Sequence, residues 1–259
     1  LGLLKIDCLG LRTLSVLQDC LDQVGWEREQ LIYYDRSDKK AFDVLNDARY
    51  TGIFQFEGSA LQGLARQLQI TDFEDIVALT ALARPGPLIS GAAAEFIKRK
   101  AGRSKVEYMP QCKEITKITL GLVVYQEQVM QIGREVGGLS WADVSELRRA
   151  MSRSLGIEYF DKFWEKFNSG VSGMSETDAK DIWHNINSMG SWAFNRSHSV
   201  AYGLVSYWCA VLKYKFPLEF AAATLRNAMD DDQAVKILRE LDKEGYEFVA
   251  FDKELSDAH

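Results

Sequence analysis

The sequence lacks every cysteine arrangement that typically binds zinc or forms a disulfide framework. Its four cysteines, Cys8, Cys20, Cys112 and Cys209, are far apart along the chain, include no C-x-x-C pair, and each lies in a locally apolar stretch. Cysteines of this kind are usually buried and reduced. We therefore expect free thiols and a cytoplasmic protein.

The sequence also lacks an apolar run long enough to cross a membrane. Its longest candidate, residues 200–212, contains Ser206 and is followed by Lys213 and Lys215, whereas a spanning helix needs about 20 apolar residues. The chain begins at Leu1 without a basic and apolar leader. We therefore expect no signal peptide, and a chain that starts inside a longer one.

Motifs of several enzyme classes are missing as well. No Ser–His–Asp or Cys–His set occurs at a recognisable spacing, and there is no glycine-rich phosphate loop. Internal repeats, low-complexity linkers and heptad runs are also absent. The sequence thus gives no support to a hydrolase, a solenoid or a coiled coil.

What the sequence does have is helical periodicity over most of its 259 residues, 47% of which are hydrophobic and can form a substantial core. Strands are expected only at residues 3–9, 52–56 and 246–251. The expected helices cover residues 13–24, 38–48, 59–69, 72–83, 92–101, 124–136, 140–152, 158–170, 176–188, 197–216, 218–229 and 231–244. We predict a mainly α fold, in which one strand precedes a large helical domain with minor short strands.

The net charge of −6 is unevenly distributed. Residues 219–259 carry 11 acidic and five basic side chains, which account for all of it. Residues 84–105 carry six basic side chains against Glu95 alone, a local charge of +5. A polyanion could bind there, although a solvated helix end explains the same charges.

Asp7 is the one carboxylate in the apolar strand expected at residues 3–9. A buried carboxylate is costly unless it is paired or bound to a metal. It could pair with Lys5 or Arg12, or it could bind Mg²⁺. Magnesium sites for phosphoryl transfer generally use at least two carboxylates, and this segment supplies one.

Arg84 precedes Pro85, Gly86 and Pro87, a sequence that ends a helix abruptly and can hold one guanidinium in place. A cation at a helix C-terminus also suits the helix dipole. A phosphate contact and a purely structural role are therefore both open for Arg84.

Arg148 and Arg149 belong to a helix expected to begin with Ser140 as its cap. The apolar stripe of this helix consists of Trp141, Val144, Leu147 and Met151. Arg148 borders the stripe and Arg149 points away from it. Exposed arginines are usually just solvated, yet a phosphate needs planar, charged donors of this kind.

Residues 194–202 place polar donors at the start of a helix, where free amides and the helix dipole favour an anion. Ser197 can accept hydrogen bonds from the amides that open this helix. His198 and Tyr202 are four residues apart and share a face. Packing with a hydrogen bond is the simpler interpretation of this pair, and catalysis the less common one.

Taken in order, these segments resemble the C-family replicative DNA polymerases, the catalytic α subunits of bacterial DNA polymerase III. The matching segments are LKIDCLGLRTL (4–14), FQFE (54–57), FEDI (73–76), RPGPL (84–88), VYQEQVM (124–130), LRRAM (147–151), FNRSHS (194–199) and AY (201–202). The resemblance is colinear and covers nearly the whole chain. It implies template-directed nucleotidyl transfer of a dNTP to a primer end in DNA replication.

The resemblance also implies a division of the chain. Residues 1–13 would be the end of a palm domain, and residues 14–259 a fingers domain that is truncated at its C-terminal end. Asp7 would be the third carboxylate of a two-metal Mg²⁺ site, and Lys5 would lie near the triphosphate. The two other aspartates would lie upstream of Leu1, so this piece alone is expected to be inactive.

By the same resemblance, part of the fingers surface faces the incoming dNTP and the DNA. The residues expected there are Arg84, Arg148, Arg149, Arg153, Asn195, Arg196, Ser197, His198 and Tyr202. The implied partners are primer–template DNA, dNTP, and, through regions outside this sequence, a sliding clamp and other replisome subunits, with no membrane. A free-standing helical module that binds nucleotides or nucleic acids without catalysis is the alternative.

Overall fold

The protein is described here by a computed structural model, which covers residues 10–153, 156–190 and 192–249. Within these ranges the fold is helical and contains no strand. The helices are α1 (Arg12–Val24), α2 (Arg28–Ile32), α3 (Lys39–Asn46), α4 (Ser59–Ala65), α5 (Phe73–Leu82), α6 (Pro85–Ile89), α7 (Ala92–Lys100), α8 (Lys113–Thr116), the 3₁₀ turn η1 (Lys117–Thr119), α9 (Gln126–Gln131), the π-helical turn η2 (Ile132–Val136), α10 (Trp141–Ser152), α11 (Ile157–Asp161), α12 (Trp164–Gly170), α13 (Glu176–Gly190), α14 (Arg196–Lys215), α15 (Pro217–Arg226) and α16 (Asp231–Lys243). The predicted mainly α fold is confirmed.

The expected minor strands are not found. Gly52 and Gln55 have positive φ angles of 76° and 63°, which a strand cannot accommodate, so residues 52–56 form turns instead. Residues 246–249 are irregular. The strand expected at residues 3–9 and the end of the one at 246–251 lie outside the described residues.

The predicted helices are present, with ends within about four residues of those expected, whereas α2, α6, α8 and η1 were not predicted. The helix expected at 124–136 is α9 followed by η2, and that at 158–170 divides into α11 and α12. Ser140 caps α10 as expected, because its hydroxyl accepts from the Asp143 amide at 3.1 Å. Pro217 opens α15 directly after α14, since a proline fits the first helical position.

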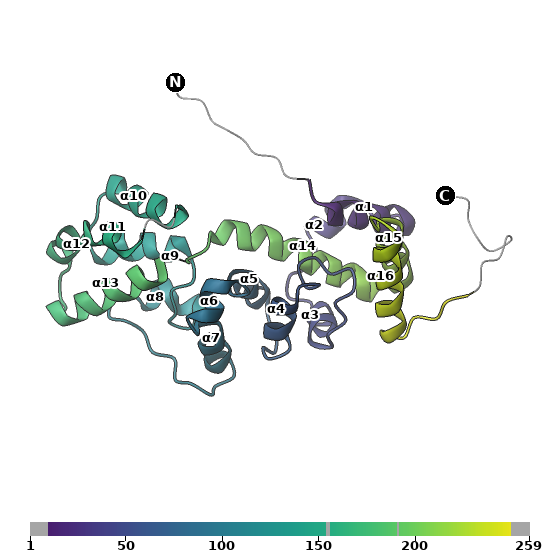
Figure 1. The fold of residues 1–259 in the computed structure, drawn as a ribbon, viewed down its shortest axis with the longest axis horizontal. Helices are drawn as coiled ribbons and strands as arrows, with labels where there is room; N and C mark the ends of the chain where they lie inside the picture. Colours follow the sequence, from purple (N-terminus) through teal and green to yellow (C-terminus); the bar gives the residue numbers. More distant parts are fainter. Residues whose placement is uncertain (1–9, 154–155, 191, 250–259) are drawn as a thin grey trace, which may run out of the picture.

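Two main hydrophobic cores lie along an elongated molecule, and α14 runs from one toward the other (Figure 1). The first core is built from α1–α5, α7, α14 and α15, and the second from α8–α13. A 20-residue helix is about 30 Å long. Along that length α14 packs against α5, α3, α1 and α15, so it is the axis of the first core.

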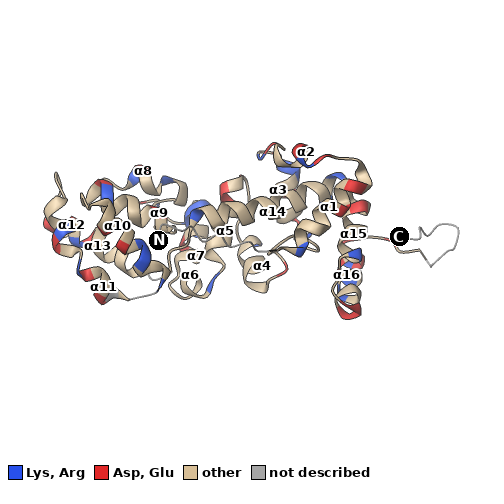
Figure 2. Cartoon of the chain, turned by 90° about the horizontal axis from the view of Figure 1, so that it is seen from above, with Lys and Arg blue, Asp and Glu red and all other residues tan. Residues whose placement is uncertain are grey.

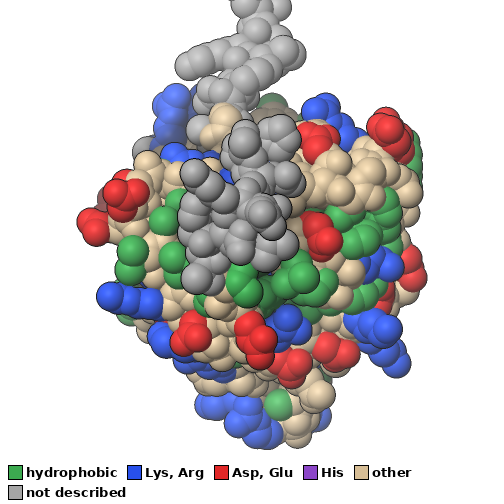
Figure 3. Space-filling view, turned by 90° about the vertical axis from the view of Figure 1, so that its right-hand side faces the viewer, with side chains coloured by type: hydrophobic (Ala, Val, Ile, Leu, Met, Phe, Trp, Pro, Cys, Tyr) green, Lys and Arg blue, Asp and Glu red, His purple; other side chains and the backbone are tan. Residues whose placement is uncertain are grey.

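Acidic and basic residues both occur along the whole length of the described chain (Figure 2). At the end formed by α15 and α16, hydrophobic side chains lie exposed between charged ones (Figure 3). None of the helices in the described ranges combines the length and apolarity that a membrane crossing requires.

Cys20, Cys112 and Cys209 are buried free thiols, as expected, while Cys8 lies outside the described residues. Burial raises the pKa of Cys112 to about 11 and those of Cys20 and Cys209 to about 12. An unfolded cysteine ionises near pH 8.5, so these thiols contribute stability that is lost as the pH rises above about 9.

In a Cys8→Ser variant we expect the three remaining thiols to react with a disulfide reagent only as fast as the protein unfolds, because the reactive thiolate is suppressed by burial. Absorbance of the released thiol at pH 8, with and without denaturant, measures this. Rapid labelling of the native protein would contradict the burial of the thiols.

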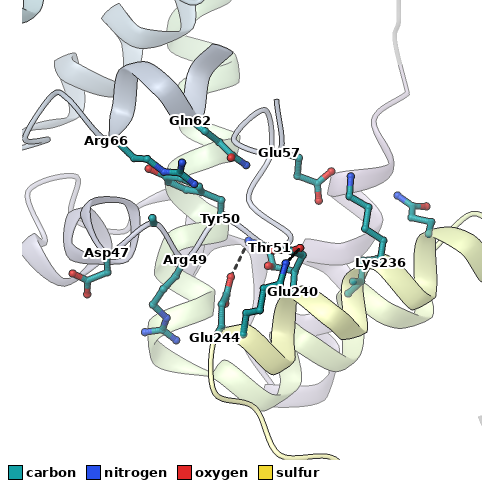
Figure 4. A pocket seen from close by; sticks show the side chains of 14 residues that line it. Asp47, Arg49, Tyr50, Thr51, Glu57, Gln62, Arg66, Lys236, Glu240 and Glu244 are labelled. Carbon is teal, nitrogen blue, oxygen red and sulfur yellow. Dashed lines mark hydrogen bonds and ion pairs between the residues drawn. The ribbon is translucent and has the colours of Figure 1, made fainter. Parts of the chain in front are cut away.

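Lys213 is a fully buried cation on α14. Its Nζ forms an ion pair with Glu244 Oε2 at 2.6 Å and donates to the Thr51 carbonyl at 2.7 Å, while Glu244 Oε1 accepts from the Thr51 amide at 3.1 Å. Burial lowers the pKa of Lys213 to about 8, which the charge of Glu244 opposes. The three residues tie α14 to the turn at Gly52 and to the chain at the end of α16. Figure 4 shows the bond between Thr51 and Glu244.

Lys213→Met should lower the free energy of unfolding by about 3–5 kcal/mol, because it leaves Glu244 buried without its partner. The double variant with Glu244→Gln should recover part of the loss. Lys243→Met, which removes the exposed partner of Glu240, is the matched control and should cost under about 1 kcal/mol. Urea unfolding at pH 7 compares them, and equal losses for both lysines would contradict a buried pair.

Candidate functional site

Several of the segments singled out in the sequence meet at the start of α14. Residues 124–126 and 194 form an isolated parallel bridge, in which the Gln126 amide donates to the Phe194 carbonyl at 2.9 Å and the Phe194 amide to the Val124 carbonyl at 3.0 Å. The VYQEQVM and FNRSHS segments, about 70 residues apart in the chain, are thereby joined through their backbones.

Asn195 is the N-cap of α14, and the expected cap at Ser197 is wrong. The Asn195 side-chain oxygen accepts from the His198 amide at 2.9 Å, and its Nδ2 donates to Glu127 Oε1 at 2.7 Å. Glu127 Oε2 also accepts from the Arg196 amide at 2.9 Å. Two opening amides of this helix therefore already have acceptors, and Ser197 is an exposed residue of the first turn.

Arg196 connects α14 with the FEDI segment. Its Nη2 donates to Glu74 Oε1 at 2.7 Å, and its Cζ lies 5.9 Å from the centre of the Tyr125 ring. Its Nε is buried and has no partner among the described residues. Arg196 is thus largely engaged within the fold, which a reading of the sequence could not reveal.

Arg84 lies where α5 ends and α6 begins. Its Nη2 donates to the Trp192 carbonyl at 2.8 Å and its Nε to the Ala81 carbonyl at 2.9 Å. Burial lowers the pKa of its guanidinium. Gly86 is required beside it, because a Cβ there would lie 2.6 Å from the Cβ of Trp192. The RPGP turn ends α5, as expected, and also starts α6 with Pro85 at the first position.

Aromatic rings continue from Arg84 along the exposed side of α14. The Arg84 Cζ lies 4.0 Å from the centre of the Phe194 ring, whose centre is 5.2 Å from that of His198. The His198 and Tyr202 rings stack at 3.9 Å, and Tyr202 lies 5.2 Å from Phe54. We call these five residues the aromatic ladder. The packing expected of His198 and Tyr202 is present, as a ring stack.

The arginines of α10 lie apart from the ladder, on the helix that packs in the second core. Arg148 and Arg153 are exposed and have no ion pair among the described residues, while Arg149 pairs with Glu146 at 2.9 Å. The buried stripe of α10 consists of Val144, Leu147, Ala150 and Met151. Trp141, which was expected in that stripe, is 66% exposed.

Half of the basic side chains at residues 84–105, Arg84, Arg99 and Lys100, are bonded within the fold. Arg99 pairs with Glu95 and donates to the Leu120 carbonyl, and Lys100 pairs with Asp75. Lys105 pairs with Glu107 on the surface, where both side chains are exposed. Of the six, only Lys98 and Arg103 are exposed without an ion pair to a described residue. The local charge of +5 therefore overstates the available phosphate contacts.

Two pockets lie toward opposite ends of α14. One of about 790 Å³ borders its N-terminal half and is lined in part by Ile118, Met130, Arg134, Trp141, Arg196 and Val200; we call it the Trp141 groove. The other, of about 650 Å³, lies between residues 47–66 and α16 (Figure 4). Four carboxylates and four cations line the latter, so it has no net attraction for an anion.

Lys5 and Asp7, the expected catalytic residues, lie outside the described residues. In the described ranges no group of three or more His, Cys, Asp or Glu side chains could hold a metal ion. The expected metal site therefore depends on Asp7 and on carboxylates from elsewhere.

We expect Asn195→Ala to lower the free energy of unfolding by about 0.5–2 kcal/mol, because it removes the cap of α14. Ser197→Ala, two residues on, is the matched control and should change stability by under about 0.5 kcal/mol. Chemical denaturation of both variants measures the difference. A larger loss of stability in Ser197→Ala than in Asn195→Ala would show that Ser197 is the cap.

Comparisons with known proteins agree on one family. Residues 13–175 match the model of the bacterial DNA polymerase III alpha subunit finger domain. The chain is 36% identical to the DNA polymerase III subunit alpha of Aquifex aeolicus, in a match that covers 99% of this chain and 23% of that protein. It is 38% identical to the DNA polymerase III subunit alpha of Mycobacterium tuberculosis, in a match that covers 95% of this chain and 22% of that protein. The Escherichia coli K12 subunit is 36% identical over 90% of the chain and 21% of the relative. The chain thus spans less than a quarter of the length of these relatives.

Proposed function

We propose that this chain, which belongs to the bacterial DNA polymerase III alpha subunit finger domain family, serves a template-directed DNA polymerase by binding the incoming dNTP and the template. The reaction would be nucleotidyl transfer to a primer end in DNA replication. Residues 14–259 would form the fingers and residues 1–13 the end of the palm.

One observation supports this proposal above the others. Segments from four separate parts of the chain, containing Phe54, Arg84, Glu127 and residues 194–202, meet along the exposed side of α14. Stacked rings and a guanidinium offer flat, sequence-tolerant surfaces for a nucleobase. Core packing alone does not require an exposed His198 ring stacked on the half-buried Tyr202.

The contacts refine the expected roles of these residues. His198 and Tyr202 would contact the nucleotide, because their rings are accessible, and Arg148 and Arg153 would contact phosphates, because they are unpaired. Arg84, Asn195 and Arg196 would act mainly by positioning, because their polar atoms bond within the fold. Arg149 is half exposed beside Glu146 and would exchange that partner for a phosphate. Ser197 would present its hydroxyl beside His198.

Catalysis would require the rest of the longer protein. A divalent metal, Mg²⁺ by our proposal, would be held by Asp7 with two aspartates from upstream, with Lys5 near the triphosphate. Such metals stabilise the charge that develops on the transferred phosphoryl group. Primer–template DNA, a sliding clamp and other replisome subunits are the proposed partners, in the cytoplasm.

In the complete polymerase, His198→Ala should raise the KM for dNTP about tenfold and leave the melting temperature nearly unchanged, because it removes one exposed stacking surface. Steady-state primer extension and thermal unfolding of the same samples measure both. Tyr33→Ala, which removes an 82% exposed ring at the end of α2, is the control. A lower melting temperature of His198→Ala with an unchanged KM for dNTP would indicate that the aromatic ladder has only a structural role.

Asp7→Asn in the same complete enzyme should keep the fold and lower kcat by orders of magnitude, because it removes one charge from the metal site. The isolated chain should not extend a primer at all. Near-normal turnover by the variant would contradict the metal-binding role and favour an ion pair between Asp7 and Lys5 or Arg12.

A further inference from the structure

An apolar stripe of α14 has no part in the function proposed above. Val200, Leu204 and Trp208 follow one another at intervals of four residues, so they lie on one side of the helix, and all three are half-buried. His198 and Tyr202 each precede a stripe residue by two positions, which places them about 160° away around the helix. The stripe is therefore a different surface from the aromatic ladder.

The stripe runs through two adjoining apolar pockets. Val200 and Leu204 line the Trp141 groove, and Trp208 lines a second pocket of about 710 Å³ beside α1 and α2, which we call the Trp208 pocket. The apolar lining of the Trp208 pocket also includes Leu14, Leu17, Leu21, Leu31 and Ile32. Leu204 and Trp208 are one helical turn apart, so the two pockets adjoin along α14. We call the stripe and both pockets together the α14 surface.

The walls of the α14 surface keep large apolar side chains in contact with solvent. Figure 1 shows α10 and α1 above the two ends of α14, with α3 below it. Trp141 of α10 is 66% exposed, and Leu14 of α1 and Ile32 of α2 are 45% and 51% exposed. Contiguous apolar patches of this kind usually mark a contact with another protein surface. Two of the six tryptophans line the α14 surface, and tryptophan is enriched among the residues that dominate protein interfaces.

The charges at the α14 surface cancel, so they do not select a polyanion. The charged side chains that line the Trp141 groove are two acids and two bases, namely Glu127, Glu135, Arg134 and Arg196. In the Trp208 pocket, Asp19 pairs with Arg226 at 3.4 Å. Asp22 and Arg28 bond to the same Gln18 side chain at 2.7 and 2.5 Å. An apolar surface with balanced charge fits a protein segment, whereas nucleic acids require an excess of positive charge.

The length of the relatives indicates where such a protein segment would come from. The chain matches 23% of the Aquifex aeolicus protein and 22% of the Mycobacterium tuberculosis protein, so more than three quarters of each lies outside the match. Permanent interfaces are more apolar than transient ones. A segment tethered to the same polypeptide also has an effective concentration of about a millimolar or more. Both points favour an intramolecular occupant over a separate partner.

We propose that an amphipathic helix from outside residues 1–259 of the same longer polypeptide covers the α14 surface. From Val200 to Trp208 the stripe is about 12 Å long, which equals about two turns of a facing helix. Apolar side chains three and four residues apart on that helix would pack between the rows of α14, at an axial separation of about 8–10 Å. Ala201, exposed at the edge of the stripe, leaves room for this close approach. The inference goes beyond the proposed function and does not depend on nucleotide binding.

Alkylation of Ala201→Cys tests the proposal. In the isolated chain this thiol should react with iodoacetamide about as fast as that of Asp43→Cys, the matched control, which is exposed on α3 at another side of α14. In the complete polymerase without DNA, the reaction at position 201 should be about tenfold slower or more, while that at position 43 should be unchanged. A covered thiol reacts only when the contact opens. Mass spectrometry of the labelled peptides measures each thiol separately.

A cross-link identifies the occupant directly. A benzophenone attached to the thiol of Ala201→Cys in the complete polymerase should, on illumination, join a peptide of the same polypeptide from outside residues 1–259. That peptide should carry apolar residues three and four positions apart, as a facing helix requires. The same label on Asp43→Cys should not join that peptide.

Four outcomes would overturn the proposal. The first is equal alkylation of position 201 in the isolated chain and in the complete polymerase. The second is protection that grows with the concentration of the isolated chain, which would assign the α14 surface to a second copy. The third is protection that appears only when single-stranded DNA is added, which would assign it to a nucleic acid. The fourth is a cross-link to a peptide within residues 1–259.

Discussion

The carboxylate of Glu127 is the contact on which the rest of the site depends. Glu127 lies on α9 in the second core, and it accepts from Asn195 and from the first amide of α14, the axis of the first core. A negative charge at a helix N-terminus is favoured by the helix dipole and by the unpaired amides there. With the adjoining backbone bridge at Phe194, this single side chain fixes how the two cores meet. It also sets where the aromatic ladder begins.

The helical character of the chain and the extent of its long helices could be predicted from the sequence, because apolar periodicity reports which face of a helix is buried. The short helices α2, α6 and α8 could not, since four or five residues carry too little periodicity. Residues 52–56 alternate like a strand, yet Gly52 and Gln55 adopt positive φ angles that local sequence did not indicate. Tertiary packing against α14, where Ser206 donates to the Phe54 carbonyl, holds that turn.

The site could be predicted as a set of segments but only partly as a set of roles. The sequence identified Arg84, Arg196, His198 and Tyr202, and the structure brings their segments together. The sequence could not indicate that Arg84 bonds to a backbone carbonyl 108 residues away, or that Arg196 bonds to a carboxylate 122 residues away. Trp141 was misassigned for a related reason. Ala150 completes the buried stripe of α10 and leaves the indole outside.

The unbroken length of α14 has a mechanical consequence. Its C-terminal half is anchored by the buried Lys213 to Glu244 and Thr51, and its other end presents His198. A straight rod about 30 Å long that pivots by five degrees at one end moves its other end by about 3 Å. That distance is comparable to the spacing of stacked bases. Because Glu127 and the Phe194 bridge hold the start of α14 as well, the helix is anchored at both ends, and a tilt imposed near α16 could displace the His198 and Tyr202 rings only by breaking those contacts.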